Sequence, residues 1–411
     1  MNLAKELAAR GLMEYTSADA GKIFGTRRVA YSGFDPSADS MQIGNLAAII
    51  TMKRLADAGH KIIFLAGGAT GMIGDPKEKG ERPMKSVREV AANTRAIKKQ
   101  FKQVLGKTPF TLVDNADWLG KEKLIPFLRD IGKYFTVNDL IKRETIRKRL
   151  ETPDESISYT EFTYTLLQGF DYFFLNGKYG CDLQVGASDQ WTNILSGVDL
   201  LHKKKGKEVF AFTIPLVTDA SGKKFGKSEG NAIWLDPKKT SPFAFYQFWV
   251  NLPDDSIEKY LKVYTFLSLE EIAELMQLHA KNPGERAAQA KLAWEVTALV
   301  HGAAAAKAAA EASKALFGGT SLASLSSGAR AVVLKEAPTL RVGAKAILVD
   351  ALVESGLASS KGDARRLIEG KGVSLNGTLV EANRPLAASD FFKGLALLKK
   401  GKRDLRVLIL K

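Results

Sequence analysis

Apolar and polar positions along the first half of the chain predict short buried strands separated by longer helices. Apolar runs with the length of buried strands occur at 28–34, 61–65, 110–113, 182–185 and 209–217. Between them, stretches such as 86–105 and 159–175 have the helical period. Strands that alternate with helices of this length form a parallel sheet covered on both faces. The expected fold class is α/β, a doubly wound parallel sheet that binds ligands at the carboxyl ends of its strands.

Two glycine-rich turns fall at that edge of the expected sheet. The stretch 31–45 leads from a strand through a Gly/Pro/Asp turn into a helix that begins near Ile43, where free backbone N–H groups favour an anion. Gly44 lies in the first turn of that helix and leaves room for a flat or phosphorylated ligand. The second turn, 67–76, follows the next strand. For 31–45 alone, a turn that only packs is the alternative.

The helix expected over 159–175 carries a polar stripe between phenylalanines. Tyr164, Gln168 and Asp171 are spaced i, i+4, i+7 and therefore share one face. The phenylalanines leave little helix surface for water, which favours an inward-facing, hydrogen-bonded stripe over a solvent-exposed one. Asp189, after the strand at 182–185, is placed to cap the following helix, and a cap alone would explain it.

The second half of the chain is predicted to contain a loop, a helical region and a small basic module. A polar glycine-rich loop carries Lys224 and Lys227, and such a loop can close its ammonium groups over phosphates, with a solvated hairpin as the alternative. Residues 240–317 are expected to be helical and 318–328 to be a Gly/Ser-rich linker. From about Ala344 two helices and short strands predict a separate α+β module.

Composition and charge narrow the class of protein and its partners. A length of 411 residues requires more than one core, and 45% hydrophobic with 26% charged residues is typical of a soluble protein. No membrane span or signal sequence is evident, so we expect a cytoplasmic protein without a membrane partner. One cysteine and four histidines argue against a disulfide framework and a protein-ligated metal.

The basic charge indicates a polyanionic partner. The net charge is +15, and residues 341–411 carry 14 Lys and Arg against 7 Asp and Glu. Nucleic acid is the natural partner for such a concentration of charge. A protein that is merely basic and soluble is the alternative.

Several segments together, in this order and spacing, resemble the bacterial tyrosyl-tRNA synthetase family of class I aminoacyl-tRNA synthetases. They are 31–36, 67–76, the stripe Tyr164, Gln168 and Asp171, the segment 186–191, and 224–228, which is similar to the family's KMSKS-type loop. The resemblance covers the whole chain. It implies a Rossmann-like catalytic domain over 1–230, an all-helical anticodon-side domain over 231–320, a linker over 321–343 and an RNA-binding domain of the ribosomal protein S-four type over 344–411. The family is homodimeric, and we expect the subunit contact near 135–150.

One motif departs from the family pattern. The family's HIGH element reads Gln42-Ile-Gly-Asn45 here, so amides replace both histidines. An amide NH₂ can donate a hydrogen bond to a phosphate oxygen as a neutral imidazole N–H does. A smaller change is Ser32, where many relatives have cysteine. The contact to the nucleotide is therefore expected to persist.

The resemblance implies a reaction and a role for each matching residue. The carboxylate of L-tyrosine attacks the α-phosphate of ATP, which enters with Mg²⁺, and the tyrosyl group then passes to the 3′ end of tRNA(Tyr). The implied donors to the phosphates are Ser37, Gln42, Lys79, Arg82, Lys224, Lys227 and Ser228. The implied ligands of the tyrosine ammonium are Asp75, Tyr164 and Gln168, and those of its hydroxyl are Tyr31 and Asp171. Contacts to ATP or the bound amino acid are implied for Asp35, Gly44, Gly186, Asp189 and Gln190. In the C-terminal module, Lys361, Arg365 and Arg366 lie on one expected helix as candidate RNA ligands, and a solvated helix face is the alternative.

Two rival functions use the same features. A tryptophanyl-tRNA synthetase shares the expected fold, but a site with Tyr31 and Asp171 suits a phenol better than an indole, which only donates. A catalytically silent RNA-binding protein on a synthetase scaffold would explain the basic module and the missing HIGH histidines. The presence of Asp75, Asp171 and Lys224 favours an active enzyme over that alternative.

Overall fold

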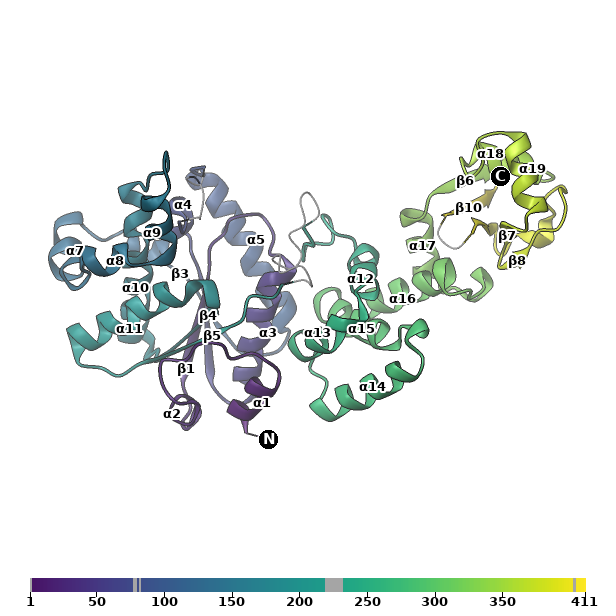
Figure 1. Ribbon diagram of the computed structural model, residues 1–411. Helices are drawn as coiled ribbons and strands as arrows, with labels where there is room; N and C mark the ends of the chain where they lie inside the picture. Colours follow the sequence, from purple (N-terminus) through teal and green to yellow (C-terminus); the bar gives the residue numbers. More distant parts are fainter. Residues whose placement is uncertain (1, 77–79, 81–82, 219–231, 402–403) are drawn as a thin grey trace. The chain divides into compact units, whose positions relative to one another are not determined.

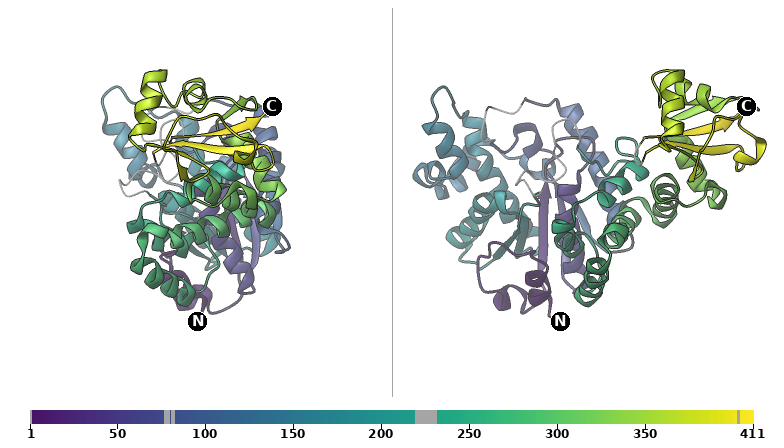
Figure 2. Two further views of the ribbon diagram at one scale, coloured as in Figure 1. Left: turned by 90° about the vertical axis from the view of Figure 1, so that its right-hand side faces the viewer. Right: turned by 45° about the vertical axis from the view of Figure 1, so that its right-hand side comes forward.

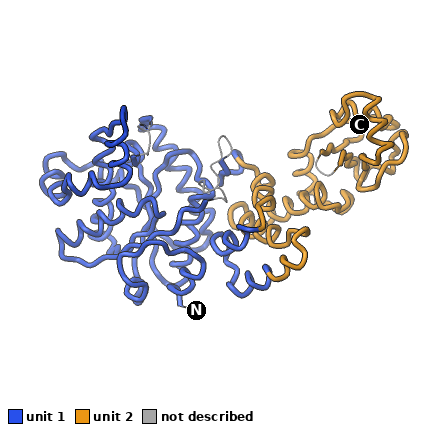
Figure 3. Tube along the Cα trace, in the orientation of Figure 1, with its two compact units in different colours: residues 1–239, 255–276 blue, residues 240–254, 277–411 orange. Residues whose placement is uncertain are grey.

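The chain divides into two compact units in the computed structural model (Figure 1), which describes all residues except 1, 77–79, 81–82, 219–231 and 402–403. Unit 1 comprises residues 1–239 and 255–276, and unit 2 comprises 240–254 and 277–411 (Figure 3).

A five-stranded parallel sheet of order β3-β2-β1-β4-β5 forms the centre of unit 1 (Figure 1). Its strands are β1 (Val29–Phe34), β2 (Lys61–Ala66), β3 (Thr111–Asp114), β4 (Leu183–Ala187) and β5 (Phe210–Ile214). The chain moves outward from β1 to β3 and then returns to place β4 on the other side of β1. This reversal confirms the predicted doubly wound α/β fold, and it opens a crevice between the carboxyl ends of β1 and β4.

Helices cover both faces of this sheet, as Figure 2 shows. On one face lie α3 (Ile43–Asp57) and α5 (Val87–Leu105), and on the other lie α10 (Tyr159–Tyr179) and α11 (Trp191–Lys205). The remaining helices of unit 1 are α1 (Leu3–Ala9), α2 (Ala20–Phe24), α4 (Thr70–Ile73), α6 (Ala116–Leu119), α7 (Leu124–Asp130), α8 (Val137–Ile141), α9 (Glu144–Glu151) and α13 (Ile257–Tyr264). Helix α14 (Leu269–Lys281) has residues in both units.

Short polar residues and glycines set the ends of the helices that carry the expected site. The hydroxyl of Ser158 accepts a hydrogen bond from the backbone N–H of Glu161 at the start of α10 (3.2 Å). The helix ends at Gly180, whose φ of 67° lies in the left-handed region. These caps fix the rotation and length of α10, so that Tyr164 and Asp171 of the polar stripe are buried as predicted.

Unit 2 contains a helical part and a second sheet. The helices are α12 (Pro242–Val250), α15 (Ala287–His301), α16 (Ala303–Phe317), α17 (Ser327–Glu336), α18 (Leu348–Glu354) and α19 (Lys361–Glu369). The sheet has the order β6-β10-β9-β7-β8, with strands β6 (Thr339–Val342), β7 (Val373–Leu375), β8 (Thr378–Leu379), β9 (Leu395–Lys400) and β10 (Asp404–Leu410). Short 3₁₀ helices occur in both units. Those of unit 1 are η1 (Gly132–Tyr134) and η2 (Ser188–Gln190), those of unit 2 are η4 (Pro283–Glu285), η5 (Leu322–Ser324) and η6 (Ala388–Asp390), and η3 (Asp254–Ser256) has residues in both.

The segment 321–343, expected to be a linker, is instead largely ordered secondary structure. Ser326 is the N-cap of α17, because its hydroxyl accepts from the N–H of Ala329 (3.2 Å). Strand β6 pairs in parallel with β10, and Val342 is buried in the core of the C-terminal module. The serine that suggested a linker therefore starts a helix, and the module's sheet begins before Ala344.

The compact units also differ from the ranges expected from the sequence. Helix α13, expected in the helical domain, packs on α3 in unit 1. The hydroxyl of Tyr264 donates to the carbonyl oxygen of Ile43 (3.2 Å), and Arg54 donates to the carbonyl oxygen of Thr265. These contacts hold 255–276 against the helix that begins at the crevice.

Candidate functional site

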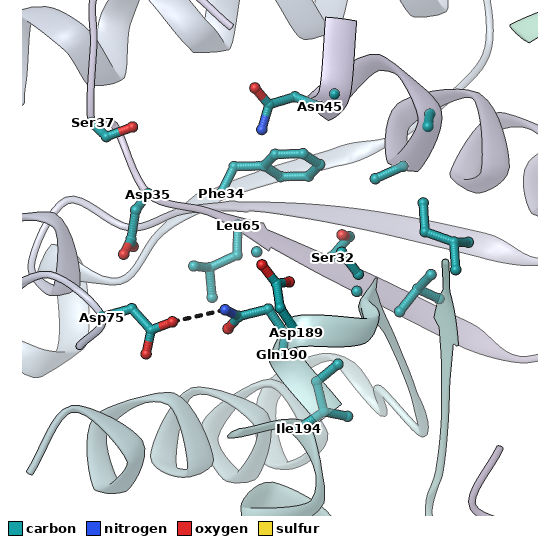
Figure 4. Close-up of a pocket in the computed structure, with 18 of the residues that line it drawn as sticks. Ser32, Phe34, Asp35, Ser37, Asn45, Leu65, Asp75, Asp189, Gln190 and Ile194 are labelled. Atoms are coloured by element: carbon teal, nitrogen blue, oxygen red, sulfur yellow. Dashed lines mark hydrogen bonds between the residues drawn. The ribbon is translucent and has the colours of Figure 1, made fainter. Parts of the chain in front are cut away.

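A cavity of about 380 Å³ lies at the crevice between β1 and β4 (Figure 4). It is lined by the end of β1 and the turn after it, the start of α3, the polar face of α10, and the connection from β4 to α11. The predicted site residues that it brings together are Tyr31, Asp35, Ser37, Gln42, Gly44, Asp75, Tyr164, Gln168, Asp171, Gly186, Asp189 and Gln190. Segments far apart in the sequence thus meet at the edge where the strand order predicts a ligand site.

One end of the cavity is built around the buried carboxylate of Asp171. Its Oδ1 accepts from the indole Nε1 of Trp118 (2.8 Å), and its Oδ2 accepts from Nδ2 of Asn115 (3.0 Å). The hydroxyl of Tyr31 is buried and has no hydrogen-bond partner in the described part of the chain. A ligand hydroxyl that donates to Asp171 and pairs with Tyr31 would satisfy this end.

Burial raises the pKa of both the Asp171 carboxyl and the Tyr31 phenol. It raises the pKa of Asp171 to about 7, although the bonds from Asn115 and Trp118 oppose that rise. Burial, together with the negative charge of Asp171, also raises the pKa of the Tyr31 phenol. Tyr31 is therefore a neutral hydroxyl at physiological pH, able both to donate and to accept.

A second carboxylate, Asp75, is held by two amides. Nε2 of Gln190 donates to its Oδ2 (2.8 Å), the bond drawn in Figure 4, and Nδ2 of Asn193 donates to its Oδ1 (2.9 Å). The two bonds fix the orientation of the carboxylate. An oriented carboxylate at the cavity wall is suited to a ligand ammonium group.

Tyr164 is hydrogen-bonded to the carboxylate of Asp35. Its hydroxyl donates to Oδ2 of Asp35 (2.8 Å), and the hydroxyl of Thr70 donates to Oδ1 of Asp35 (2.7 Å). Tyr164 thus links α10 to the turn after β1. Burial, and secondarily the charge of Asp35, raises the pKa of the Tyr164 phenol, so the phenol remains a neutral donor.

The start of α3 is fixed by an asparagine of the modified HIGH element. Oδ1 of Asn45 accepts from the backbone N–H of Gln42 (3.0 Å), which leaves the Asn45 amide nitrogen on the cavity side in Figure 4. The N–H of Ile43 donates to the carbonyl oxygen of Ile233 (3.2 Å), and the N–H of Leu235 donates to that of Met41 (2.9 Å). The segment that follows 219–231 is therefore tied to the helix start.

Gly44 leaves the cavity open at this helix start. Among the described residues, a Cβ atom built on Gly44 meets no atom within 4 Å other than its chain neighbours and its own helix backbone, and Gly44 is exposed and lines the cavity. A side chain here would occupy space that is now free for a ligand. This agrees with the room for close approach expected from the sequence.

Asp189 is not the cap of the helix that follows it. The N-cap residue of α11 is Gln190, whose side chain makes no capping hydrogen bond. Asp189 lies instead in the 3₁₀ turn η2 and lines the cavity. The extra turn between β4 and α11 moves the helix start one residue beyond the predicted cap.

Some predicted residues are outside this cavity or outside the described chain. Lys79, Arg82, Lys224, Lys227 and Ser228 lie outside the described residues. Lys361, Arg365 and Arg366 are exposed on α19, where Lys361 pairs with Asp350 (2.7 Å).

Three residues that orient the site were not predicted from the sequence. Asn115 and Trp118, which hold Asp171, follow β3 at the same sheet edge as the other site residues. Asn193, which holds Asp75, lies in the first turn of α11. Two features of the sequence could have indicated them. Asn115 and Trp118 follow the end of the strand expected at 110–113, and Asn193 lies in the first turn after Gln190.

The described residues contain no group of three or more His, Cys, Asp or Glu side chains placed to hold a metal ion. Of the helices within the described ranges, none combines the length and apolarity needed to cross a bilayer.

Comparisons with known proteins agree on one family. Residues 25–318 match the family of tRNA synthetases class I (W and Y), and residues 330–408 match the tyrosine–tRNA ligase SYY-like C-terminal domain. The chain is 46% identical to the tyrosine–tRNA ligase of Roseiflexus castenholzii and 44% identical to that of Anaeromyxobacter dehalogenans, in each case over 98% of both chains. Its structure is similar to that of a C-terminally truncated mitochondrial tyrosyl-tRNA synthetase of Aspergillus nidulans, with a TM-score of 0.68 and 33% identity over 75% of this chain and 92% of that one.

Proposed function

Because this chain belongs to the tyrosine–tRNA ligases of the class I tRNA synthetases, we propose that it activates L-tyrosine with ATP and transfers the tyrosyl group to tRNA(Tyr). In the first step an oxygen of the tyrosine carboxylate bonds to the α-phosphorus of ATP. The bond from that phosphorus to the bridging oxygen breaks, and pyrophosphate leaves. In the second step a ribose hydroxyl at the 3′ end of the tRNA attacks the carbonyl carbon and AMP leaves.

The observation that carries the proposal is a pair of carboxylates that line one cavity, the buried Asp171 and the partly exposed Asp75. Asp171 lies beside the unpartnered hydroxyl of Tyr31, whereas Asp75 accepts hydrogen bonds from the amides of Gln190 and Asn193. One carboxylate with a hydroxyl partner suits the phenol of tyrosine, and the other suits its ammonium group. A ligand that satisfies both presents its carboxylate toward the remaining space of the cavity.

The phosphate end supplies donors rather than a general base. The tyrosine carboxylate is already ionised, so the protein's task is to position it and to stabilise charge on the α-phosphate and on the departing pyrophosphate. Ser37 and Gln42 line the cavity on that side, and ATP enters as its Mg²⁺ complex. We assign the remaining cationic donors to Lys79, Arg82, Lys224 and Lys227, together with the hydroxyl of Ser228.

The end of the cavity formed by Tyr31 and Asp171 also explains selection against amino acids with indole or phenyl side chains. A buried site that pairs with a hydroxyl leaves its own polar groups unsatisfied when the hydroxyl is missing. Asp171 accepts and does not donate when ionised, while an indole N–H reaches only one of the two partners. We therefore assign tyrosine, and not tryptophan, as the amino acid.

The basic C-terminal module is proposed to bind the tRNA. Lys361, Arg365 and Arg366 are exposed on one helix of a module that lies within the match to the tyrosine–tRNA ligase C-terminal domain. The net charge of residues 341–411 favours contact with a phosphate backbone.

A homodimer is proposed from an apolar surface of unit 1. Helices α7 and α8 and their neighbour α9 expose Leu124, Ile125, Val137 and Leu150, each more than half accessible. Exposed apolar side chains gathered on a few helices are typical of a contact surface. This surface includes the expected contact region 135–150, and analytical ultracentrifugation of the Val137→Asp variant tests it.

Tyrosine-dependent exchange of pyrophosphate into ATP tests the function. We expect exchange with tyrosine, but not with tryptophan or phenylalanine, and charging of tRNA(Tyr). Asp171→Asn should severely weaken tyrosine selection. Asparagine has one accepting oxygen and an NH₂ group that only donates, so it cannot accept at both positions as the Asp171 carboxylate does. Binding of tRNA without pyrophosphate exchange would indicate a catalytically silent RNA-binding protein. Exchange that depends on tryptophan would indicate a tryptophanyl-tRNA synthetase.

A further inference from the structure

The Asp75 carboxylate is the end of a chain of side chains that leads away from the cavity to Arg143. Nδ2 of Asn193 donates to Asp75 and also to Oε1 of Gln190 (3.1 Å). On its other side, Oδ1 of Asn193 accepts from Nη1 of Arg143 (2.6 Å). We propose that Arg143 and Asn193 are positioning residues for the tyrosine ammonium group, which they serve by holding Asp75 and Gln190.

The donor character of Arg143 fixes which way the Asn193 amide faces. Oδ1 of Asn193 accepts from Arg143 and from the hydroxyl of Thr165 (2.8 Å). A hydroxyl can turn and accept instead, but a guanidinium has no acceptor. Arg143 therefore prevents the amide from turning over, and the NH₂ group must face Asp75 and Gln190.

The position of Arg143 is itself fixed by backbone. Its Nη2 donates to the carbonyl oxygen of Thr192 in the first turn of α11 (3.0 Å), so two groups of that turn bind the same guanidinium. Burial lowers the pKa of Arg143 to about 10, and the charge of Asp75 opposes that fall. Arg143 is thus cationic at neutral pH and remains a donor to Asn193.

The test separates ammonium recognition from a general loss of structure. The inference rests on the proposed function, because it takes tyrosine as the ligand of Asp75. Two competitive inhibitors of tyrosine-dependent exchange distinguish the ends of the substrate: tyramine keeps the ammonium without the carboxylate, and 3-(4-hydroxyphenyl)propanoate keeps the carboxylate without the ammonium. Arg147→Met, an exposed arginine of α9, is the matched control.

We expect Arg143→Met to raise the KM for tyrosine and the inhibition constant of tyramine by roughly tenfold or more, as for loss of a bond to a charged group. The KM for ATP and the inhibition constant of 3-(4-hydroxyphenyl)propanoate should stay within about twofold, which marks an effect on one part of the substrate. Asn193→Ala should have the same pattern, and adding Arg143→Met to it should change little, because the two act in series. Arg143→Lys should restore part of the loss.

An equal rise in the KM for ATP and in the inhibition constants of both inhibitors would show that Arg143 only stabilises the fold. An unchanged inhibition constant of tyramine would show that Arg143 does not hold Asp75. If Arg143→Met does not fold, Arg143→Lys and Asn193→Ala provide the same comparison of inhibitors. A parent protein without tyrosine-dependent exchange would contradict the proposed function itself. A parent with normal exchange and an Arg143→Met variant indistinguishable from it would overturn this inference alone.

Discussion

A carboxylate that is removed from water is costly unless its charge is paired or its proton is retained. Asp171 accepts two hydrogen bonds and yet has a pKa raised to about 7 by burial, whereas Asp75 is only partly buried and accepts a hydrogen bond from each of two amides. The two carboxylates of one cavity are therefore prepared differently. Asp171 is suited to a ligand hydroxyl, and Asp75 is suited to a ligand ammonium group.

The raised pKa of Asp171 predicts a pH-dependent effect of Asp171→Asn on stability. Between about pH 4 and pH 7 the folded protein retains a proton that the unfolded chain has lost, so the contribution of Asp171 to the free energy of unfolding falls as the pH rises through 7. Asparagine does not titrate in this range. Replacement of Asp171 removes one accepted hydrogen bond, and that loss is the same at every pH. The variant's melting temperature relative to the parent should therefore rise from pH 5 to pH 8 without tyrosine. An equal difference at both pH values would contradict the raised pKa.

Gln42→Ala should lower the rate of adenylate formation with little change in the dissociation constant of ATP. If the Gln42 amide donates mainly to charge that develops in the transition state, its loss costs roughly 2–4 kcal/mol in the barrier. The backbone N–H of Gln42, which is bonded to Asn45, is retained, so the start of α3 should persist. Rapid-quench measurement of tyrosyl-adenylate gives the rate. A weaker ATP affinity with an unchanged rate would make Gln42 a ground-state contact.

Residue types and spacing predicted the side chains that face the cavity, but not those behind them. Tyr164 and Asp171 were identified because the phenylalanines of their helix leave little surface for water, so that its polar stripe is expected to face inward. Trp118 and Asn193 were not, because they contact other side chains of the protein, and such contacts depend on distances between elements. The partner of Tyr164, Asp35, is fixed in the same way by the packing of α10 on the turn after β1.

At the scale of elements, the turn after β2 is shaped by packing more than by ligand contact. A Cβ atom on Gly67 would overlap Oδ1 of Asp35 and the hydroxyl of Thr70, two groups bonded to each other. The glycine is thus required so that Asp35 can keep its bonds to Thr70 and Tyr164.

Gly67→Ala should therefore destabilise the protein by about 1–3 kcal/mol, as overpacking of a tight site does. It should also raise the KM for tyrosine, because Asp35 and Tyr164 must move. Urea unfolding and pyrophosphate exchange measure the two effects. Gly21→Ala in α2, where an added Cβ meets no atom within 4 Å, is the control and should be neutral or slightly stabilising. Identical results for the two variants would show that the turn adapts.

Elements with a strong period and clear caps were predictable, and those that depend on pairing were not. Helix α10 begins after Ser158 and α3 begins at Ile43, as their patterns indicate. Strand β6 was missed because its four residues become a strand only by pairing with β10, more than sixty residues later. Ser326 was ambiguous for a physical reason, since serine favours both helix N-caps and loops.

At the scale of the whole molecule, sequence order and compact packing differ. The domain boundary predicted at residue 230 assumes that each domain is one continuous stretch of the chain. In the structure, residues 255–276 belong to unit 1 and pack on α3. A sequence pattern predicts that such a helix is amphipathic but not which surface it covers. The order of functions along the chain is less affected, because every described residue of the cavity precedes Leu235.

The structure of unit 2 determines where the chain can be cut to test its proposed tRNA-binding module. A cut near Ser326 would remove α17, which packs on α16 through buried Ala329 and Val333, and would expose the apolar face of α16. A stop after Ala337 keeps α17 and removes the whole second sheet, which begins with β6.

We expect this truncated chain to retain tyrosine-dependent pyrophosphate exchange, because every described residue that lines the cavity is kept. Charging of tRNA(Tyr) should fall steeply, and the salt dependence of tRNA binding should flatten by about one unit of slope for each phosphate group that the protein no longer neutralises. Lys361→Ala, Arg365→Ala and Arg366→Ala combined in the full chain provide the matched comparison, because they remove charge from α19 and leave the sheet in place. If α19 contacts the phosphates, the triple variant should reproduce part of the flattening with exchange unchanged. Unchanged charging after truncation would assign the module another task, and equal loss of exchange and charging would show that it supports the catalytic unit.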